Sequence, residues 1–207
     1  FEHIVEQFEK QGKTTMIISE NKKIIGVIAV ADAVKEDSVK AISLLNASRY
    51  RTIMITGDNE TTARAIAEKV GIKEVIANVL PEDKVKKVEE LQKQGMVAFV
   101  GDGINDAPAL KQSNVGIAMG SGTDIAIEAG DLVLAKSSLM GVVQAIRLSK
   151  ATFKKIKQNL FWAFAYNVVA IPLAVAGLLN PIIAELAMAL SSISVVTNAN
   201  LLRSVKV

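Results

Sequence analysis

The 207-residue sequence contains no cysteine, so no disulfide and no thiolate metal site can form within this chain alone. Aromatic residues make up only 4% of it and do not alternate with basic residues, as they do on many nucleic-acid-binding surfaces. The first ten residues, FEHIVEQFEK, are charged and unlike a signal peptide. The lack of alternating aromatic and basic residues predicts no nucleic-acid partner. The helical pattern at the very start suggests a fragment of a longer protein.

Two long apolar runs lie near the end of the sequence, and they account for the mean hydropathy of +0.33. Residues 161–179 include no charged residue, and residues 181–202 include only Glu185. Because a helix needs roughly 20 apolar residues to cross a bilayer, these runs predict two transmembrane helices forming a hairpin. Basic residues flank the hairpin on both outer sides, which predicts that both of its ends face the cytoplasm. These residues are Arg147, Lys150, Lys154, Lys155, Lys157, Arg203 and Lys206.

Ahead of the apolar runs, short strand-like segments alternate with helical patterns. This alternation is typical of an α/β fold with a parallel sheet flanked by helices. A helix from about residue 139 to 159 is expected to lead into the first transmembrane helix. The expected strands of the α/β part are residues 51–56, 74–77, 96–100, 115–119 and 131–135, preceded by strand-like runs at 15–19 and 24–30.

Three of the predicted strands end in turns whose residues could carry chemistry. A hydroxyl with glycine N–H groups can hold phosphate oxygens, a lysine can neutralise them, and paired aspartates suit Mg²⁺. Parallel strands would bring these turns to one edge of the sheet, which predicts a phosphoryl-transfer site. Taken singly, TGDN also fits a helix N-cap, and Lys84 also fits an exposed helix residue. The candidate site residues are Thr56, Gly57, Asp58, Lys84, Asp102, Asn105 and Asp106.

The motifs MITGDN, PEDK at 81–84 and GDGINDAPAL resemble the phosphorylation domain of the P-type ATPases, a branch of the haloacid-dehalogenase-like superfamily. The resemblance implies that Thr56 contacts the phosphoryl group, Lys84 stabilises it and Asp102 holds Mg²⁺, with Asp106 as a further Mg²⁺ ligand. It also implies that Gly57, Asp58 and Asn105 shape the pocket, and that ATP is the phosphoryl donor.

One departure from this family concerns the nucleophile. The family's Asp-Lys-Thr-Gly sequence is missing, and Asp32 lacks the Thr and Gly that would order the phosphate. The family's Cys-Pro-Cys, Thr-Gly-Glu and His-Pro motifs are missing as well. We therefore expect the phosphorylated aspartate outside this chain, and the chain alone to be inactive. The implied domains are residues 1–31 from a nucleotide-binding domain, 32–145 as the phosphorylation domain, and 146–207 as the membrane segment.

The predicted transmembrane helices contain a possible metal site. Met188 and Ser192 share a helix face, and Tyr166-Asn167 on the neighbouring helix could meet them if the hairpin packs antiparallel. A thioether is a soft ligand that suits Cu⁺, and the same residues resemble the copper-type P-type ATPases. The zinc-type relatives instead carry an aspartate in the last helix, and this sequence has none there. Glu185 fits either an ion-release site or an interfacial carboxylate that ends the helix.

The resemblance implies the C-terminal part of a Cu⁺-exporting ATPase in the plasma membrane of a prokaryote. Its implied partners are the actuator domain, the nucleotide-binding domain, the other membrane helices, the lipid bilayer and a copper chaperone. Two alternatives stay open from the residues alone. One is a membrane-anchored phosphatase or phosphotransferase of the same superfamily, which the polar residues within the predicted membrane helices disfavour. The other is a non-catalytic membrane interaction module.

Overall fold

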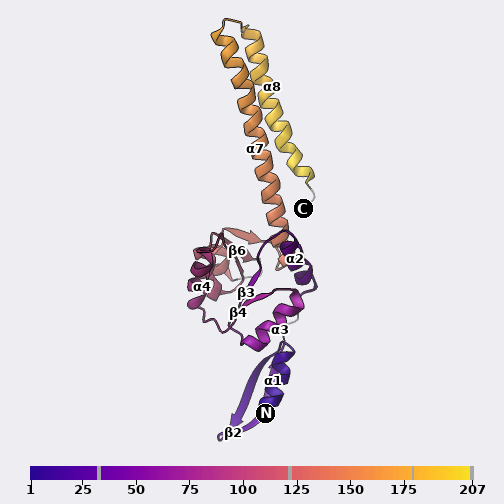
Figure 1. The fold of residues 1–207 in the computed structure, drawn as a ribbon, viewed down its shortest axis with the longest axis vertical. Helices are drawn as coiled ribbons and strands as arrows, with labels where there is room; N and C mark the ends of the chain where they lie inside the picture. Colours follow the sequence, from indigo (N-terminus) through magenta and orange to yellow (C-terminus); the bar gives the residue numbers. More distant parts are fainter. Residues whose placement is uncertain (32–33, 121–122, 179, 206–207) are drawn as a thin grey trace. The chain divides into compact units, whose positions relative to one another are not determined.

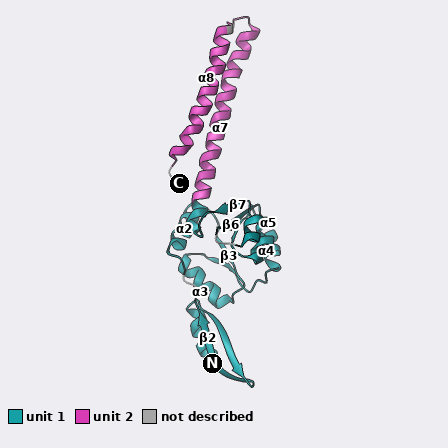
Figure 2. Ribbon diagram, turned by 180° about the vertical axis from the view of Figure 1, so that it is seen from behind, with its two compact units in different colours: residues 1–143 teal, residues 144–207 magenta. Residues whose placement is uncertain are grey.

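The computed structural model describes residues 1–31, 34–120, 123–178 and 180–205, so Asp32 lies outside the described residues. The chain divides into two compact units, residues 1–143 and residues 144–207, which are coloured separately in Figure 2. The first unit holds the strands and the shorter helices, and the second is helical. The predicted domain boundary near residue 31 stays a prediction.

The first unit has the predicted α/β architecture, with helices alternating with parallel strands (Figure 1). Besides an antiparallel pair near the start of the chain, its described strands form two parallel ladders, one of two strands and one of three in the order β5-β6-β7. All five predicted strands are confirmed; residues 115–119 form a strand with the predicted bounds, and the other four strands are shorter than the sequence pattern suggested. The five strands are β3 (Ile53–Ile55), β4 (Glu74–Ile76), β5 (Ala98–Gly101), β6 (Val115–Met119) and β7 (Leu132–Leu134).

The helices of the first unit cover these ladders and enclose one apolar core. Val88, Phe99 and Leu110 lie at its centre, and Ile55 from β3 packs against the same cluster, so one core serves both ladders. Burial of such side chains contributes about 1.5–3 kcal/mol each. The helices are α2 (Glu36–Ala47), α3 (Glu60–Val70), α4 (Asp83–Gln92), the 3-10 turn η1 (Ile104–Asp106), α5 (Ala107–Gln112) and α6 (Asp124–Ala129).

Helix α6 was not expected from the sequence. The glycine-rich run 120–122 follows β6, and its last two residues lie outside the described ones. The missed signal is Thr123, whose hydroxyl accepts a hydrogen bond from Ala126 N at 3.4 Å and caps the helix. A helix of six residues shows less than two turns of apolar periodicity, so its pattern is weak.

Arg51 links the two ladders from the side where β3 begins. Its guanidinium donates to both carboxylate oxygens of Glu74, at 2.6 and 2.5 Å, and to the side chain of Gln94 at 2.6 Å. This hydrogen bond with Arg51 holds the pKa of Glu74 below its usual value. Because Glu74 begins β4 and Gln94 precedes β5, Arg51 fixes the starting points of three strands relative to one another.

The chain begins with a helix and an antiparallel hairpin, namely α1 (Glu2–Lys10), β1 (Thr14–Glu20) and β2 (Lys23–Val30). Asn21 and Lys22 form the two-residue connection, and both have positive φ, of 48° and 64°. This combination suits the right-handed twist of a hairpin. The predicted strand-like runs are thus confirmed as paired strands.

The second unit is a hairpin of two long helices, α7 (Leu139–Val175), which starts in the first unit, and α8 (Pro181–Asn200), followed by the 3-10 turn η2 (Leu201–Ser204). Both helices are long and apolar enough to cross a membrane, which confirms the two predicted apolar helices. Asn180 caps α8 by accepting a hydrogen bond from Ile182 N at 2.9 Å. The helix predicted from residue 139 indeed continues without a break into the first apolar run.

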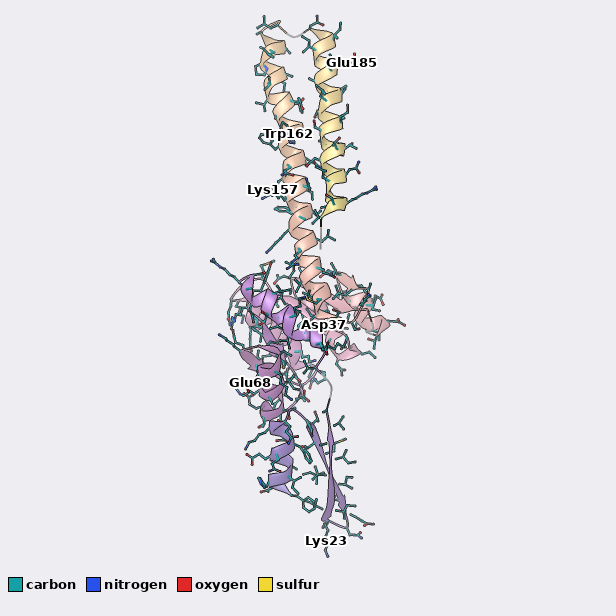
Figure 3. All side chains as sticks on the ribbon, turned by 90° about the vertical axis from the view of Figure 1, so that its right-hand side faces the viewer. Lys23, Asp37, Glu68, Lys157, Trp162 and Glu185 are labelled. Carbon is teal, nitrogen blue, oxygen red and sulfur yellow. The ribbon has the colours of Figure 1, made fainter. Side chains whose placement is uncertain are left out.

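Polar side chains join the two helices of this hairpin. Asn198 on α8 donates to Asn159 on α7 at 2.7 Å and accepts from Lys155 at 2.8 Å. Figure 3 shows Glu185 on the half of α8 next to the connecting loop, whereas Lys157 lies on the half of α7 away from it. The Asn198 bonds therefore fasten the end of the hairpin that lies farther from the loop.

Candidate functional site

The turn after β3 orders a hydroxyl. Thr56 continues the pairing with β4, because its N–H donates to Ile76 O and its carbonyl accepts from Val79 N, both at 3.0 Å. Its hydroxyl donates to a carboxylate oxygen of Asp58 at 2.9 Å and accepts from Asp58 N at 3.1 Å. The hydroxyl is therefore held in one orientation at the carboxyl end of a strand. This is the position where open α/β sheets bind ligands.

Gly57 leaves this turn open to solvent. A side chain at residue 57 would meet only the carbonyl of Val79, at 3.4 Å. Asn59 then caps α3 by accepting a hydrogen bond from Thr62 N at 2.9 Å. The N-cap interpretation of TGDN is thus correct for Asn59. The hydroxyl proton of Thr56 and the N–H of Asp58 are engaged with each other's side chains inside the turn, so this hydroxyl would have to turn from Asp58 to donate to a phosphate oxygen.

Lys84 and Asp106 bring the second and third turns together. The ammonium group of Lys84 lies 2.6 Å from a carboxylate oxygen of Asp106, and these side chains are only 16% and 15% exposed. The other carboxylate oxygen of Asp106 accepts from Gly103 N at 3.3 Å. A lysine has three N–H donors, and among the described residues Lys84 uses one of them, on Asp106, which leaves two for an anion. Lys84 is therefore not the freely solvated helix residue that its sequence context alone would suggest.

Asp102 and Asn105 lie exposed on the same turn as Asp106. The backbone carbonyl of Asp102 accepts from Thr123 N at 3.0 Å, and within the described ranges its carboxylate has neither a hydrogen bond nor an ion pair. A free carboxylate at this position has the oxygen chemistry that Mg²⁺ prefers. Among the described residues no three acidic or histidine side chains cluster around one point. Asp102 therefore fits Mg²⁺ as one ligand that phosphate oxygens and water would complete.

The predicted site residues are thus partly assembled in the first unit. The Thr56 turn is hydrogen-bonded to residues 78–79, just ahead of the PEDK turn, and Lys84 of the PEDK turn contacts Asp106. In the part of the chain that the structure describes, no hydrogen bond joins the Thr56 turn directly to the turn of Asp102. One carboxylate oxygen of Asp106 accepts from Lys84 and the other accepts from Gly103 N. This arrangement favours a role for Asp106 in shaping the pocket over its predicted role as a Mg²⁺ ligand.

Gly101→Ala should disrupt the pair of Lys84 and Asp106. An added methyl group would lie 2.7 Å from the Cβ of Asp106, closer than carbon atoms tolerate. Overpacking of this kind costs about 1–3 kcal/mol, so we expect a lower unfolding temperature for the protein in detergent. Gly95→Ala is the matched control, because nothing lies within 4 Å of the added atom. Equal midpoints for the two variants would contradict this account of Gly101.

The four predicted membrane ligands do not converge within this hairpin. Tyr166 faces α8, where its hydroxyl lies 3.3 Å from that of Ser194. Asn167 donates to Ala163 O of its own helix at 2.8 Å. Met188 is 69% exposed, and Ser192 donates to Met188 O at 3.2 Å. Consecutive helical residues point about 100° apart, so once Tyr166 faces Ser194, Asn167 is turned away from α8.

Three polar residues that hold the hairpin together were not singled out from the sequence, namely Ser194, Asn159 and Asn198. The available signal was their spacing on α8, where Ser194 and Asn198 lie four residues apart and so share a face. Met188 and Ser192 share a different, exposed face of the same helix. The helix therefore has one polar face for α7 and another that the described chain leaves open.

Comparison with known proteins agrees with this architecture. Residues 1–114 match the haloacid dehalogenase-like hydrolase family, so the chain belongs to that family. It is 54% identical over 206 residues to a copper-exporting P-type ATPase of Staphylococcus saprophyticus, covering 99% of this chain and 26% of that protein. It is also 54% identical to a probable copper-exporting P-type ATPase V of Mycobacterium tuberculosis, covering 96% of this chain and 26% of that protein. The predicted resemblance to the P-type ATPases is thus confirmed.

The solved structures include a similar protein, a zinc-transporting PIB-type ATPase in its E2.Pi state. The TM-score is 0.85 at 40% identity, and the match covers 98% of this chain and 33% of the other. The chain spans about a quarter of the length of the curated relatives it matches.

Proposed function

We propose that this chain is the C-terminal part of an ATP-driven pump that exports Cu⁺ through an aspartyl-phosphate intermediate. The observation that carries the phosphoryl-transfer part is the contact between Lys84 and Asp106. It joins the PEDK and GDGIND turns at the carboxyl ends of the strands. Phosphoryl transfer depends mainly on positioning and charge neutralisation. The Lys84 ammonium is held in place by Asp106 and carries the positive charge, so it can contribute to both.

Each residue of this site has a separate role in the proposal. Thr56 and the N–H groups of its turn bind phosphate oxygens, and Lys84 neutralises their charge. Asp102 binds Mg²⁺, which when present screens the charge between phosphate groups. Asp106 orients Lys84 through the 2.6 Å contact. The phosphorylated aspartate belongs to a part of the pump outside this chain, so the isolated chain should not hydrolyse ATP.

The membrane part of the proposal assigns Met188, Ser192, Tyr166 and Asn167 to Cu⁺ binding. Met188, Ser192 and Asn167 are exposed on the hairpin, where ligands from another helix of the pump could complete a site. The soft thioether of Met188 suits Cu⁺ better than a harder ion. The copper-exporting names of the curated relatives support this cargo. The zinc-transporting structure makes Zn²⁺ the alternative to test.

Metal-stimulated ATPase activity of the complete pump tests the cargo directly. We expect stimulation by Cu⁺ and by Ag⁺, which is similarly soft, and none by Zn²⁺. Stimulation by Zn²⁺ alone would reject the copper assignment. Phosphatase turnover independent of any metal cargo would instead favour the membrane-anchored phosphatase.

Topology gives a further prediction, because basic residues flank both outer ends of the hairpin. We expect both ends of the hairpin in the cytoplasm. The proposed partners of the chain are the other domains of the pump, the lipid bilayer and a copper chaperone. Cysteines introduced at Lys154 and Lys206 should react with an impermeant reagent from the same side of a sealed membrane vesicle. The chain has no natural cysteine to interfere, and labelling from opposite sides would refute the arrangement.

A further inference from the structure

The phosphate-binding turn is held from a segment that the proposed site does not include. In the first unit, the end of α1 and the start of β1 lie against the N-terminus of α3. The buried hydroxyl of Thr62 donates to Lys13 O at 3.2 Å, and Lys69 donates to Gln11 O at 2.5 Å. These contacts fasten the backbone of residues 11–13 to α3.

Two side chains of the same segment reach the TGDN turn. The carboxylate of Glu9 accepts from the amide of Asn59 at 2.8 Å and from the hydroxyl of Thr15 at 3.2 Å. The hydroxyl of Thr14 donates to Asp58 at 3.3 Å. Asp58 in turn holds the hydroxyl of Thr56 at 2.9 Å. A continuous series of hydrogen bonds therefore connects the α1–β1 segment with the proposed phosphate-binding hydroxyl.

The chemistry of Asn59 indicates that its contact with Glu9 is specific. Serine, aspartate and asparagine all serve as N-caps, and any of them could accept the bond from Thr62 N. An aspartate could cap α3 but could not donate to a carboxylate, whereas the asparagine amide does both, with its oxygen at Thr62 N and its nitrogen at Glu9. Glu6, one turn earlier on α1, makes an ordinary exposed pair with Lys10 at 2.9 Å. Glu9 instead is half-buried and binds two neutral donors.

We propose that Glu9 is a positioning residue that acts through Asn59, so that docking of the α1–β1 segment on α3 sets the geometry of the turn presenting Thr56. This inference rests on the proposed phosphoryl-transfer function. When the segment leaves α3, the turn loses both its bond to Glu9 and its bond from Thr14. Phosphate binding and the docking of this segment are then coupled, because each favours the same conformation of the turn.

Exchanging the donor and the acceptor of the hydrogen bond between Asn59 and Glu9 tests this proposal in the complete pump. Asn59→Asp keeps the cap but removes the donor and opposes two carboxylates, so we expect phosphoenzyme formed from inorganic phosphate to fall about tenfold. Glu9→Gln alone should change little, because its side-chain oxygen still accepts from Asn59. Glu9→Gln combined with Asn59→Asp should restore the phosphoenzyme, since the new amide donates to the new carboxylate. Glu6→Gln is the matched control and should have no effect.

Hydrogen exchange of residues 56–62 without any substrate provides a readout that does not depend on the proposed function. Asn59→Asp should raise the exchange of this segment, and the double variant should return it to the wild-type rate. Unchanged exchange and phosphoenzyme in Asn59→Asp, or no recovery in the double variant, would overturn the role of Glu9. If the wild-type pump forms no phosphoenzyme, the proposed function fails, while the exchange pattern still decides the role of Glu9.

Discussion

Replacing Asp102 by alanine in the complete pump should abolish the Mg²⁺-dependent phosphoenzyme. Its carboxylate is exposed and has no hydrogen-bond or ion-pair partner among the described residues, so the substitution removes the proposed Mg²⁺ ligand and breaks none of the described side-chain hydrogen bonds. Loss of one electrostatic group aimed at a transferring phosphate costs about 10²–10³ in rate. The measurement is the phosphoenzyme level from labelled ATP at saturating Mg²⁺.

Lys84→Ala should also lower this level, but for two reasons that a second variant separates. The substitution removes the charge near the phosphate and leaves Asp106 half-buried without its partner. Asp106→Asn keeps an oxygen acceptor for Lys84 and should reduce activity less. Glu89→Ala, on the exposed side of α4, serves as the control and should match the wild type. Normal phosphoenzyme in both Asp102→Ala and Lys84→Ala would reject the assigned site.

Met188→Ala should remove most Cu⁺ stimulation of the ATPase while leaving phosphorylation by inorganic phosphate intact. The reason is that a proposed Cu⁺ ligand is lost, whereas the proposed phosphate site lies in the other unit of the chain. Met188→Leu retains the apolar volume but not the sulfur, so it should behave like Met188→Ala. Asn167→Ala should have the same effect on Cu⁺ stimulation. The measurement is ATPase rate against free Cu⁺, combined with bound copper per protein.

A packing role for Met188 predicts a different pattern. Met188→Leu would then resemble the wild type, since the two side chains have similar volume. Leu186→Ala is a suitable control, because Leu186 is 58% exposed on the same helix and offers no ligand atom. Unchanged copper stoichiometry in both Met188→Ala and Asn167→Ala would exclude this site.

Fold class followed from the sequence because its signals are local and repeated. Runs such as 96–100 and 115–119 alternate with helical spacing, and two runs of about 20 apolar residues leave few options besides membrane helices. The bounds of most strands did not follow, because hydrogen bonding to a neighbour sets where a strand begins and ends; of the five parallel strands only β6 has the predicted bounds. Helix α6 was missed since six residues are too few to establish a period.

The candidate phosphate site could be located from its motifs, because parallel strands place their carboxyl ends at one edge. The sequence determined which groups are available: a hydroxyl at Thr56, an ammonium at Lys84 and a carboxylate at Asp102. Only the tertiary structure decided how they are used. It pairs Lys84 with Asp106 across 22 residues, and leaves Asp102 without a side-chain partner among the described residues.

The same distinction between sequence and tertiary structure applies to the membrane hairpin. Its two helices and the presence of Met188 and Asn167 were determined by the sequence, through apolar length and ligand chemistry. The rotation of each helix about its axis was decided by packing, because Tyr166 meets Ser194 and Asn198 meets Asn159. No local pattern specifies this rotation, since it depends on contacts between residues 28 and 39 positions apart. For the same reason, the hydrogen bond from Asn59 to Glu9, 50 positions away in the sequence, became evident only in three dimensions.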